Sequence, residues 1–399
     1  MPPDPIRNEE LPFFSVPGHS PDAAPLLVVR KNRWLYRLFA PTFVSPVVLK
    51  PVRRRPRRQK PFRVILRGVA LDRSDKQLRI LDRSRDITEP SRLKPLALVI
   101  PWAVFLWAVL RYDIFQLYFD GGFLSRTIGK RLEMPLLKLL GKKIIVSAYG
   151  GDVRVERITR TLGEYNCCMD CTQRLKACIC DDNLARRNLA HVQRYADSTL
   201  SMGDMTEYTP GSRNDLFYWA IDLKKWPFVG VSLSSSPVKV LHAPNHPQFK
   251  GTRYLEACIK QLQDEGYPVQ LVLVTELSNE EAKEVYKQAD IVADQFLIGW
   301  HGNFAVEAMA LGKPVVAYIR KPEVYLPHGV ECPIVNANPG TLRHALVTLI
   351  ENPTLRYELG VKGRQYVEQV FSLERVGARM DRLYRQLEGD SAPVGGGVR

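Results

Sequence analysis

The sequence predicts an α/β protein with two parallel-sheet layers in tandem, and the pattern of apolar runs carries this prediction. Short apolar runs of strand length alternate with segments of helical spacing, and the alternation occurs twice along the chain. Such alternation is typical of βαβ units and a parallel sheet. The length of 399 residues allows two domains, and a composition of 45% hydrophobic and 25% charged residues is that of a globular protein.

The first layer follows an N-terminal extension, residues 1–60, that is rich in Pro and Arg and has no sustained period. Strand-length runs then appear as FRVILRGVA, YDIFQLYF and KKIIVSAYG. The longest apolar run, residues 96–110, is shorter than the roughly 20 residues that span a bilayer and contains Pro101. We expect it to be a core helix, with contact to a membrane surface as the alternative.

The second layer begins near residue 237 with the runs VKVLHAPN, VQLVLVT, DIVADQF and KPVVAYI. Between the layers, the segment NDLFYWAIDLKKWPF around Asp222 suits a hinge. The expected division is an extension over 1–60, an N-terminal domain over 61–222, a C-terminal domain over 223–371, a closing helix over 372–388 and a disordered tail over 389–399.

The chain is basic, since 57 Lys and Arg residues face 42 Asp and Glu residues. Basic proteins attract nucleic acid, anionic lipid headgroups or phosphorylated small substrates. Much of the excess lies in RRRPRRQK, residues 53–60, which is either a solvated linker or a patch that contacts membrane or polyphosphate. The first residues lack a basic segment followed by an apolar run, so we expect a cytoplasmic protein, with attachment to the inner face of a membrane as an extension of that expectation.

Glu307 is the most informative carboxylate, because it lies in the small-residue stretch FAVEAMALGKPVVAYIR. In open α/β sheets, ligands collect at the carboxyl ends of strands, where helix N-termini point their free N–H groups. The predicted helix follows Gly299 and Gly302, which allow close backbone approach to a ligand, and ends at Gly312. The alternative is purely structural, since a carboxylate near a helix N-terminus gains about 0.3–1 kcal/mol without a ligand.

The stretch GNFAVEAMALGKPVVAY resembles the nucleotide-sugar site of retaining GT-B glycosyltransferases related to family 4. That family carries a Glu, seven residues and a second Glu before the segment AMA.GKPVV. GKKIIVSAYGGDVR, WAID and the tail LGVKGRQYVEQVFSLERVGARMDRLYRQL are also similar to its segments, so the resemblance covers residues 61–387. It implies a GT-B fold, in which two Rossmann-like α/β/α domains face a central cleft.

The resemblance also implies roles for the donor side. Glu307 matches the second Glu, which binds the ribose, and a carboxylate suits the paired hydroxyl donors of ribose. Lys250 in FKG matches the Lys that binds the diphosphate. Gly299 takes the position of the first Glu, and here the sequence departs from the family. Contacts to the donor sugar are therefore expected from backbone N–H groups around Gly302 and Asn303, or from Asp294. The expected donor residues around this departure are Asp294, Gly299, Gly302, Asn303 and Phe304.

The Arg that the family places upstream of its Lys has no counterpart here. His242 or His246 would substitute for it at the diphosphate, or both are structural. Positive charge is needed there because the leaving group gains charge as the sugar bond breaks.

In the N-terminal domain, five residues are candidates. Gly121 and Gly122 follow a strand and would line the acceptor side. Tyr149 takes the place of a His that contacts the donor sugar in relatives. Asp152 and Arg154 match the Asp and Arg of the family segment GSDVR, and for Asp152 a catalytic role and a structural N-cap stay open.

Five of the seven cysteines lie in CCMDCTQRLKACIC, residues 167–180. Clustered thiolates in a cytoplasmic chain more often bind metal than form disulfides, and four sulfurs at this spacing suit structural zinc. An Fe–S cluster and free thiols are the alternatives. The expected zinc ligands, which would brace the acceptor domain, are Cys168, Cys171, Cys178 and Cys180.

We therefore expect a glycosyltransferase that moves a sugar from a nucleotide-sugar donor to a glycan, lipid-linked or natural-product acceptor, with retention. The retaining reaction uses the leaving phosphate to help deprotonate the acceptor, so no dedicated base and no catalytic metal are expected. A non-catalytic GT-B subunit that binds nucleotide sugar is the first alternative. A nucleic-acid-binding protein that uses the basic arm and a zinc knuckle is the second and least favoured alternative.

Overall fold

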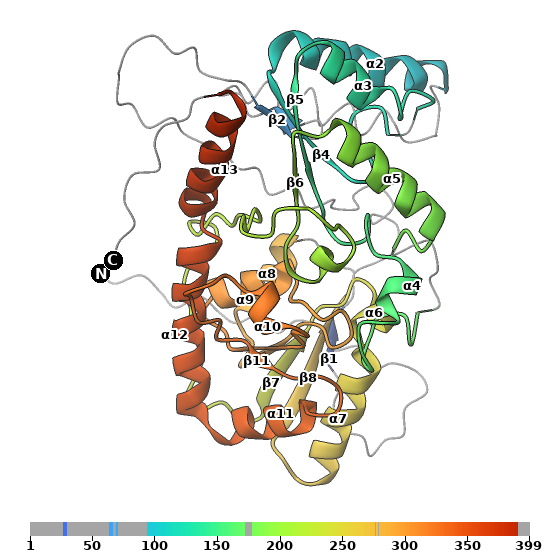
Figure 1. Cartoon of the computed structure of the whole chain (residues 1–399). Coiled ribbons are helices and arrows are strands. Elements are labelled where there is room, and N and C mark those ends of the chain that lie inside the picture. Colours follow the sequence, from blue (N-terminus) through green and yellow to red (C-terminus); the bar gives the residue numbers. More distant parts are fainter. Residues whose placement is uncertain are drawn as a thin grey trace, which may run out of the picture.

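The computed structural model of the chain describes residues 27–29, 64–66, 69–70, 94–125, 127–171, 178–275, 277 and 279–389. The basic segment 53–60 and, beyond Gly389, the predicted disordered tail lie outside the described residues. The described part forms two sheets with helices around them, one above the other in Figure 1.

The N-terminal domain is built on a five-stranded sheet. In spatial order its strands are β3 (Val69–Ala70), β2 (Val64–Leu66), β4 (Ile114–Tyr118), β5 (Lys143–Ser147) and β6 (Ser198–Leu200). β4 and β5 form the centre and pair in parallel from Ile114 with Lys143 to Tyr118 with Ser147. Their side chains are mostly buried, because helices cover both faces of a parallel sheet.

The C-terminal domain is built on a six-stranded sheet in which every strand pair is parallel. In spatial order its strands are β1 (Leu27–Val29), β8 (Val269–Val274), β7 (Val238–His242), β9 (Ile291–Ala293), β10 (Val315–Ala317) and β11 (Val335–Asn336). The carboxyl ends of β7 and β9 are neighbours, which brings the residues that follow these two strands together.

Two strands differ from the sequence-based expectation. β1 lies inside the N-terminal extension, yet it pairs in parallel with β8 at the edge of the C-terminal sheet. Three residues are too short to show a period, and edge pairing uses the backbone rather than a side-chain pattern. The run FRVILRGVA divides into β2 and β3, which pair antiparallel, because strands joined by a two-residue connection cannot be parallel.

The helices of the N-terminal domain surround its sheet. They are α2 (Lys94–Arg111), α3 (Glu133–Leu139), α4 (Glu156–Thr159), α5 (Asp182–Tyr195) and the 3₁₀ helix η1 (Gly203–Glu207). The side chain of Asp181 caps α5 by accepting the backbone N–H of Leu184 at 2.9 Å. α2 contains Pro101 and corresponds to the predicted core helix, with Phe105, Ala108 and Val109 buried.

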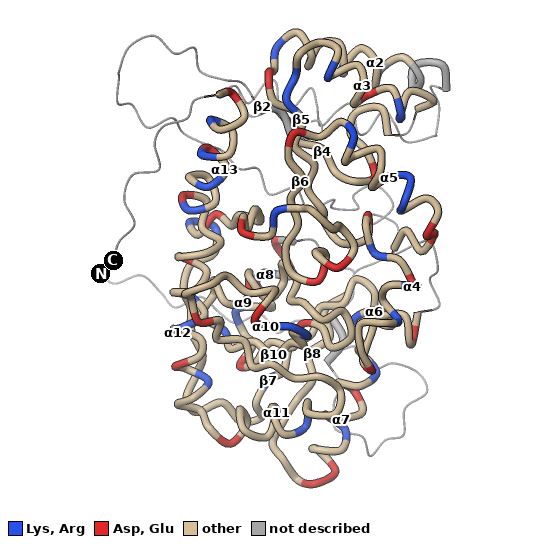
Figure 2. Tube along the Cα trace, viewed as in Figure 1, with Lys and Arg blue, Asp and Glu red and all other residues tan. Residues whose placement is uncertain are grey.

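The helices of the C-terminal domain alternate with its strands and then continue past the last one. They are α6 (Pro247–Lys250), α7 (Thr252–Asp264), α8 (Asn279–Tyr286), α9 (Asn303–Ala310), α10 (Pro322–Tyr325), α11 (Leu342–Glu351), α12 (Pro353–Val370) and α13 (Leu373–Leu387). Charged residues of both signs occupy the outer helices of both domains (Figure 2).

Two of the passages of the chain between the domains, near Ile221 and near Phe371, are joined by hydrogen bonds. The backbone N–H of Ile221 donates to Phe371 at 2.8 Å, and that of Leu373 donates back to Ile221 at 3.2 Å. α12 lies along the C-terminal domain and α13 continues to the N-terminal one (Figure 1), where Tyr384 donates a 3.0 Å hydrogen bond to Gln116 of β4. The predicted hinge at Asp222 is therefore next to the start of α13.

The hydrophobic core runs through both domains. One buried cluster joins residues of both sheets, including Phe115 and Val315, and a second lies wholly in the C-terminal domain around Val240, Ile291 and Leu346. In the part of the chain that the structure describes, no helix has the length and apolar character needed to cross a membrane.

Candidate active site

A chain of polar contacts joins the carboxyl ends of β7 and β9 to the start of α9. Lys250, at the end of α6, is buried, and its Nζ donates to Oδ1 of Asp294 at 3.1 Å. Oδ2 of Asp294 accepts the backbone N–H of Gly302 at 2.6 Å. Gly302 is the N-cap of α9 and supplies no side-chain cap. This arrangement brings together Lys250, Asp294 and Gly302, as the resemblance implies.

Asp294 is fully buried and uses both carboxylate oxygens inside the protein. It therefore holds Lys250 and the start of α9 in place rather than offering a free oxygen to a sugar. Lys250 keeps two of its three N–H donors available, and its Nζ also lies 5.7 Å from the centre of the Phe304 ring. The cation is thus fixed in position before any ligand arrives.

Glu307 lies beyond the first turn of α9, which contains no acidic residue. The favourable effect of a helix N-terminus falls off within the first turn, so it does not explain this carboxylate. Burial raises the pKa of Glu307 to about 7, opposed by the positive charge of Lys250. Its carboxylate has no hydrogen bond or ion pair with the described residues. The side chain is half-buried, and a raised pKa caused by burial makes Glu307 a candidate for a functional site.

The two histidines differ in their surroundings. His242 is fully buried, with Nδ1 2.7 Å from the backbone oxygen of Ala293 and Nε2 2.8 Å from Oγ1 of Thr252. Both ring nitrogens are engaged, so His242 ties β7 to the end of β9. His246 caps α6, and burial together with Lys250 lowers its pKa. Of the two, His246 is the one left to meet a diphosphate.

Gly299 stands where the resembled family has its first Glu, and its surroundings explain the departure. It has φ of +89°, and a Cβ placed on it would lie 2.5 Å from the guanidinium carbon of Arg320. Arg320 therefore fills the space of a side chain at position 299. Its Nη2 donates to the backbone oxygens of Ile298 at 3.2 Å and Tyr165 at 3.3 Å, and Tyr165 belongs to the N-terminal domain.

Sequence reasoning missed Arg320, although it lies just after β10, at the same end of the sheet as the donor residues. Its Nε and Nη1 atoms are buried without a hydrogen-bond partner. Only its place just after a predicted strand could have indicated it, since residues that follow parallel strands lie at the end of the sheet where ligands bind.

On the N-terminal side, Asp152 is committed to the backbone. Its Oδ1 accepts the N–H groups of Tyr149 and Gly150 at 3.0 Å each, and its Oδ2 accepts that of Phe119 at 3.3 Å. Burial raises its pKa to about 7, although these hydrogen bonds oppose the rise. Asp152 thus joins the loops that follow β4 and β5, which positions both.

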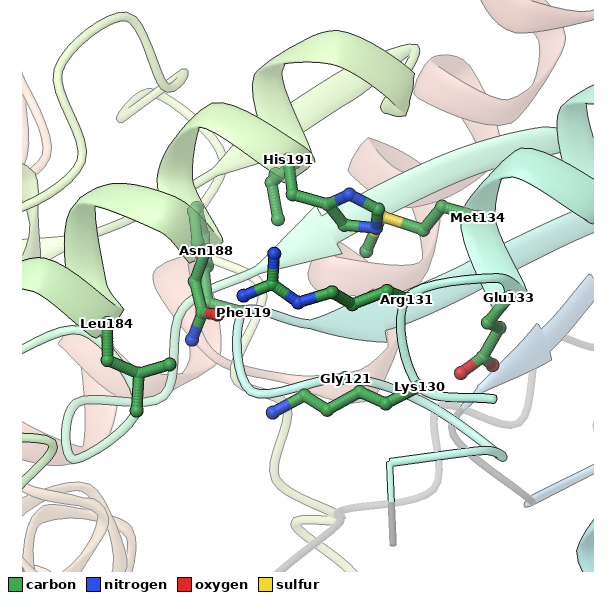
Figure 3. Close-up of a pocket in the computed structure, with 10 residues that line it drawn as sticks. Phe119, Gly121, Lys130, Arg131, Glu133, Met134, Leu184, Asn188 and His191 are labelled. Carbon is green, nitrogen blue, oxygen red and sulfur yellow. The ribbon is translucent and has the colours of Figure 1, made fainter. Parts of the chain in front are cut away.

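Tyr149 is 43% exposed and donates its hydroxyl to Asp120 at 3.1 Å. Its ring meets that of Tyr118 edge to face at 5.1 Å. Gly121 follows Asp120 and lines a cavity of about 130 Å³ (Figure 3), whereas Gly122 is packed against the carboxylate of Glu133. Of the two glycines, Gly121 is the one at a surface that a ligand can reach.

Arg154 is buried in a bidentate ion pair with Asp204, through Nε at 2.6 Å and Nη2 at 2.7 Å. The Asp204 carboxylate raises the pKa of Arg154 against the effect of burial. Its guanidinium carbon also lies 5.8 Å from the centre of the Phe249 ring on α6. Arg154 therefore connects the N-terminal domain to the helix that carries Lys250.

The cysteine-rich segment belongs to the N-terminal domain but also packs against the C-terminal domain. Cys167 is buried in a cluster with Phe249, Leu297 and Ile298. Among the described residues, which include all four predicted ligands, no three or more His, Cys, Asp or Glu side chains are placed so that they could hold a metal ion. Structural zinc at these cysteines stays a prediction.

Further contacts hold the two domains together on this side. Lys321 and Tyr325 both donate to Oε1 of Glu207, at 2.6 and 2.7 Å, and Arg253 pairs with Asp170 at 2.7 Å. These contacts fix the N-terminal domain against the C-terminal one near α6 and α10.

No protein-family profile matches the sequence. No curated protein matches it either. Among solved structures, the chain is similar to sucrose-phosphate synthase from Thermosynechococcus elongatus, with a TM-score of 0.51 and 16% identity over 74% of this chain and 79% of that one. It is also similar to HepE from Anabaena in complex with UDP and glucose, with a TM-score of 0.47 and 16% identity over 74% of this chain and 83% of that one.

Sucrose-phosphate synthase is a GT-B glycosyltransferase. At such identity the likeness speaks to the fold, and it agrees with the two mostly parallel sheets. The prediction made from the sequence is confirmed at this level: the chain has the GT-B fold, with two Rossmann-like domains.

Proposed function

We propose that the chain is a glycosyltransferase that takes a sugar from a nucleoside diphosphate donor. The observation that carries the proposal is Glu307, a half-buried carboxylate with a raised pKa and without a hydrogen bond or ion pair to the described residues, at the end of the C-terminal sheet where Lys250 is fixed. Ribose supplies two hydroxyl donors to such a carboxylate, and hydrogen bonds to the charged form lower its pKa again. The donor would therefore remove the cost that Glu307 imposes on the empty site.

Lys250 would bind the diphosphate with its two available N–H groups. His246 and the leading N–H groups of α9 lie on the same side and add favourable electrostatics for an anion. Because Asp294 already fixes Lys250, the cation needs no reorganisation as charge develops on the leaving group. This is electrostatic stabilisation by a preorganised site.

In the retaining reaction that the resemblance implies, the bond between the sugar C1 and the diphosphate oxygen breaks. The acceptor hydroxyl forms a new bond to C1 on the same face, and its proton goes to the leaving phosphate. The acceptor would enter from the N-terminal side, where Gly121 and Tyr149 lie. Asp152 would act by positioning, since its oxygens are held by backbone N–H groups.

We also propose contact with an anionic membrane surface. Leu106 and Leu110 of α2 and Ile128 and Leu132 of the loop before α3 are exposed by 57, 81, 97 and 54%. Trp102 of α2 packs on Gly129 of this loop, so the two segments are neighbours. Exposed apolar side chains next to basic ones suit an interface with anionic lipid. Sedimentation with vesicles of phosphatidylglycerol tests this, and replacement of Leu106 and Leu110 by Gln should reduce the bound fraction.

The donor proposal is tested by calorimetric titration with UDP, GDP and their sugar conjugates. Micromolar binding of one nucleotide is expected, and Glu307→Ala and Lys250→Ala should each weaken it at least tenfold. The matched controls are Glu323→Ala on α10 and Lys225→Ala in the linker, which are exposed and away from the contacts described.

The result that would overturn the donor site is a folded protein that binds none of these ligands. Tight binding of a nucleotide sugar without hydrolysis or transfer to any acceptor would instead favour the non-catalytic GT-B subunit. Equal weakening by the exposed control substitutions would show that general charge, rather than these two residues, is responsible.

A further inference from the structure

The cavity that Gly121 lines lies in the N-terminal domain, between the loop after β4 and helix α5. It has a volume of about 130 Å³, small beside the roughly 300–1,000 Å³ of pockets that enclose whole drug-sized ligands. Its size suits one group of a larger ligand. Figure 3 shows Arg131 and Lys130 extending from the loop toward α5, with Asn188 and His191 facing them from the helix.

The positively charged side chains at this cavity lack a negatively charged partner among the described residues. The side chains of Lys130 and Arg131 have no ion pair or hydrogen bond with the described residues, and Arg131 is exposed. Nε2 of His191 is buried without a hydrogen-bond partner. Burial lowers the pKa of His191, and the charges of Arg131, Arg194 and Lys130 lower it further, which reports a positive potential here. Basic positions also follow α5 in Figure 2.

One carboxylate lines the cavity, but it is already engaged. Glu133 is the first residue of α3, and its two oxygens accept the backbone N–H groups of Phe123 at 2.8 Å and Leu124 at 3.1 Å. Its side chain points away from Arg131 and Lys130 in Figure 3. The negative charge is thus used to hold the loop, and it leaves the cations at the cavity without a counterion.

The cavity is connected to the proposed acceptor side by two hydrogen bonds. Phe119 and Gly121 line it, and the N–H of Phe119 is held by Asp152. Asp120, between them, accepts the hydroxyl of Tyr149. A group bound in the cavity would therefore lie against the same loop that contacts Tyr149.

We propose that this cavity binds a phosphate group of the acceptor. The inference rests on the proposed transferase function and names the class of its acceptor. A phosphate offers several charged oxygens, which matches a guanidinium fork, an ammonium, an imidazole and an amide that converge from two elements. A carboxylate has only two oxygens for the same four groups. The exposed apolar side chains of Ile128 and Leu132 in the same loop favour a phosphate that is carried on a lipid.

The test follows the ring resonances of the seven histidines by NMR while the full-length protein is titrated with inorganic phosphate. His191→Gln assigns the reporter of the cavity, and His246→Gln assigns a reporter beside Lys250. Phosphate should shift the His191 resonances. Arg131→Gln and Lys130→Gln should each weaken that response at least tenfold, whereas Arg187→Gln, an exposed cation of α5 that does not line the cavity, should change it less than twofold.

Failure of this inference is distinguishable from failure of the donor site. UDP or GDP should shift His246 and leave His191 in place, and Arg131→Gln should not alter that response. If no nucleotide moves His246 while phosphate moves His191, the transferase proposal fails and the phosphate cavity stands. The phosphate cavity is overturned if His191 does not respond to phosphate, or if Arg187→Gln weakens the response as much as Arg131→Gln.

Two further ligands identify the source of the phosphate. Glucose 1-phosphate is a soluble monoester, and vesicles of neutral lipid with phosphatidic acid present the same group on a lipid. Stronger displacement of inorganic phosphate by the vesicles, per accessible phosphate, is expected. Stronger displacement by the sugar phosphate would support a soluble acceptor in the same cavity, and displacement by neither would overturn the proposal.

Discussion

Two regions of the molecule, the surroundings of Lys250 and the cavity beside α5, treat charge differently. In the C-terminal domain, Lys250 is buried and already bonded to Asp294, so its charge is balanced before a ligand arrives. In the N-terminal domain, Lys130 and Arg131 line a cavity without an ion pair to the described residues. Balanced charge preserves geometry, whereas unbalanced cations attract an anion. Substitutions of balanced charges should therefore affect folding and turnover, whereas substitutions of the cations at the cavity should affect ligand binding.

The largest expected effect is on a balanced charge of the N-terminal domain. Arg154→Ala leaves the buried carboxylate of Asp204 without its partner and should lower the free energy of unfolding by about 3–5 kcal/mol. Urea denaturation measures this. Lys260→Ala, which removes an exposed pair with Asp264 on α7, should cost under about 0.5 kcal/mol. A loss at Arg154 as small as the control would mean that the pair does not stabilise the N-terminal domain.

The next effect separates positioning from binding at Lys250. Lys250→Met keeps the apolar stem and removes the cation, and it should lower kcat for sugar transfer at least a hundredfold, which corresponds to about 2.7 kcal/mol. Asp294→Asn keeps one acceptor oxygen and replaces the other by an NH2 group, which cannot accept from Lys250 or from the Gly302 N–H, so the hold on Lys250 weakens. A smaller loss in kcat is therefore expected, with little change in KM. Equal losses in the two variants would contradict the division between a contacting and a positioning residue.

Glu307→Gln tests whether the negative charge of Glu307 lowers or raises the stability of the protein. The folded pKa of Glu307 is about 7, above its unfolded value, because burial disfavours the charged form. The wild type therefore loses stability as pH rises from about 4.5 through 7. At pH 8 the Gln variant should be more stable than the wild type by about 1–3 kcal/mol, and the difference should vanish near pH 4. A helix-terminus carboxylate would instead make the variant less stable.

The same variant should bind a sugar nucleotide at least tenfold more weakly at pH 8. Wild-type affinity should fall as pH drops below 7, because protonation of Glu307 removes an acceptor for the ribose hydroxyls. A sugar nucleotide is the right probe, since its phosphates are esterified on both sides and do not titrate near neutral pH, unlike a terminal phosphate. Glu323→Gln serves as the control, and an unchanged pH profile in Glu307→Gln would contradict the assignment.

The apolar runs predicted the sheets because burial on both faces of a parallel sheet requires them, and strand ends brought Lys250 and Glu307 into one site. Other features had no local pattern. β1 is three residues long, and its place depends on a free edge of β8. The cavity takes Arg131 and His191 from segments about sixty positions apart, so only the fold brings them together. The Arg320 guanidinium occupies the space that a side chain at position 299 would need, and no spacing in the sequence indicates this.

The smallest expected effect concerns that space. Gly299→Ala should be destabilising, because a left-handed φ of +89° strains any side chain and its Cβ meets the Arg320 guanidinium. Arg320→Ala alone removes contacts to the backbone of Ile298 and Tyr165. In the double variant the clash is gone and only the backbone strain remains. In a double-mutant cycle of unfolding free energies, the double variant should therefore lose about 1 kcal/mol less than the sum of the two single losses.

A cycle in which the two effects simply add would show that Arg320 moves aside without cost, and that position 299 is open to other side chains. Coupling of the expected sign would show that the two residues exclude each other. A glycine at 299 would then be the condition for Arg320 to reach Tyr165, so the departure from the family motif places a cation between the two domains at the end of β10.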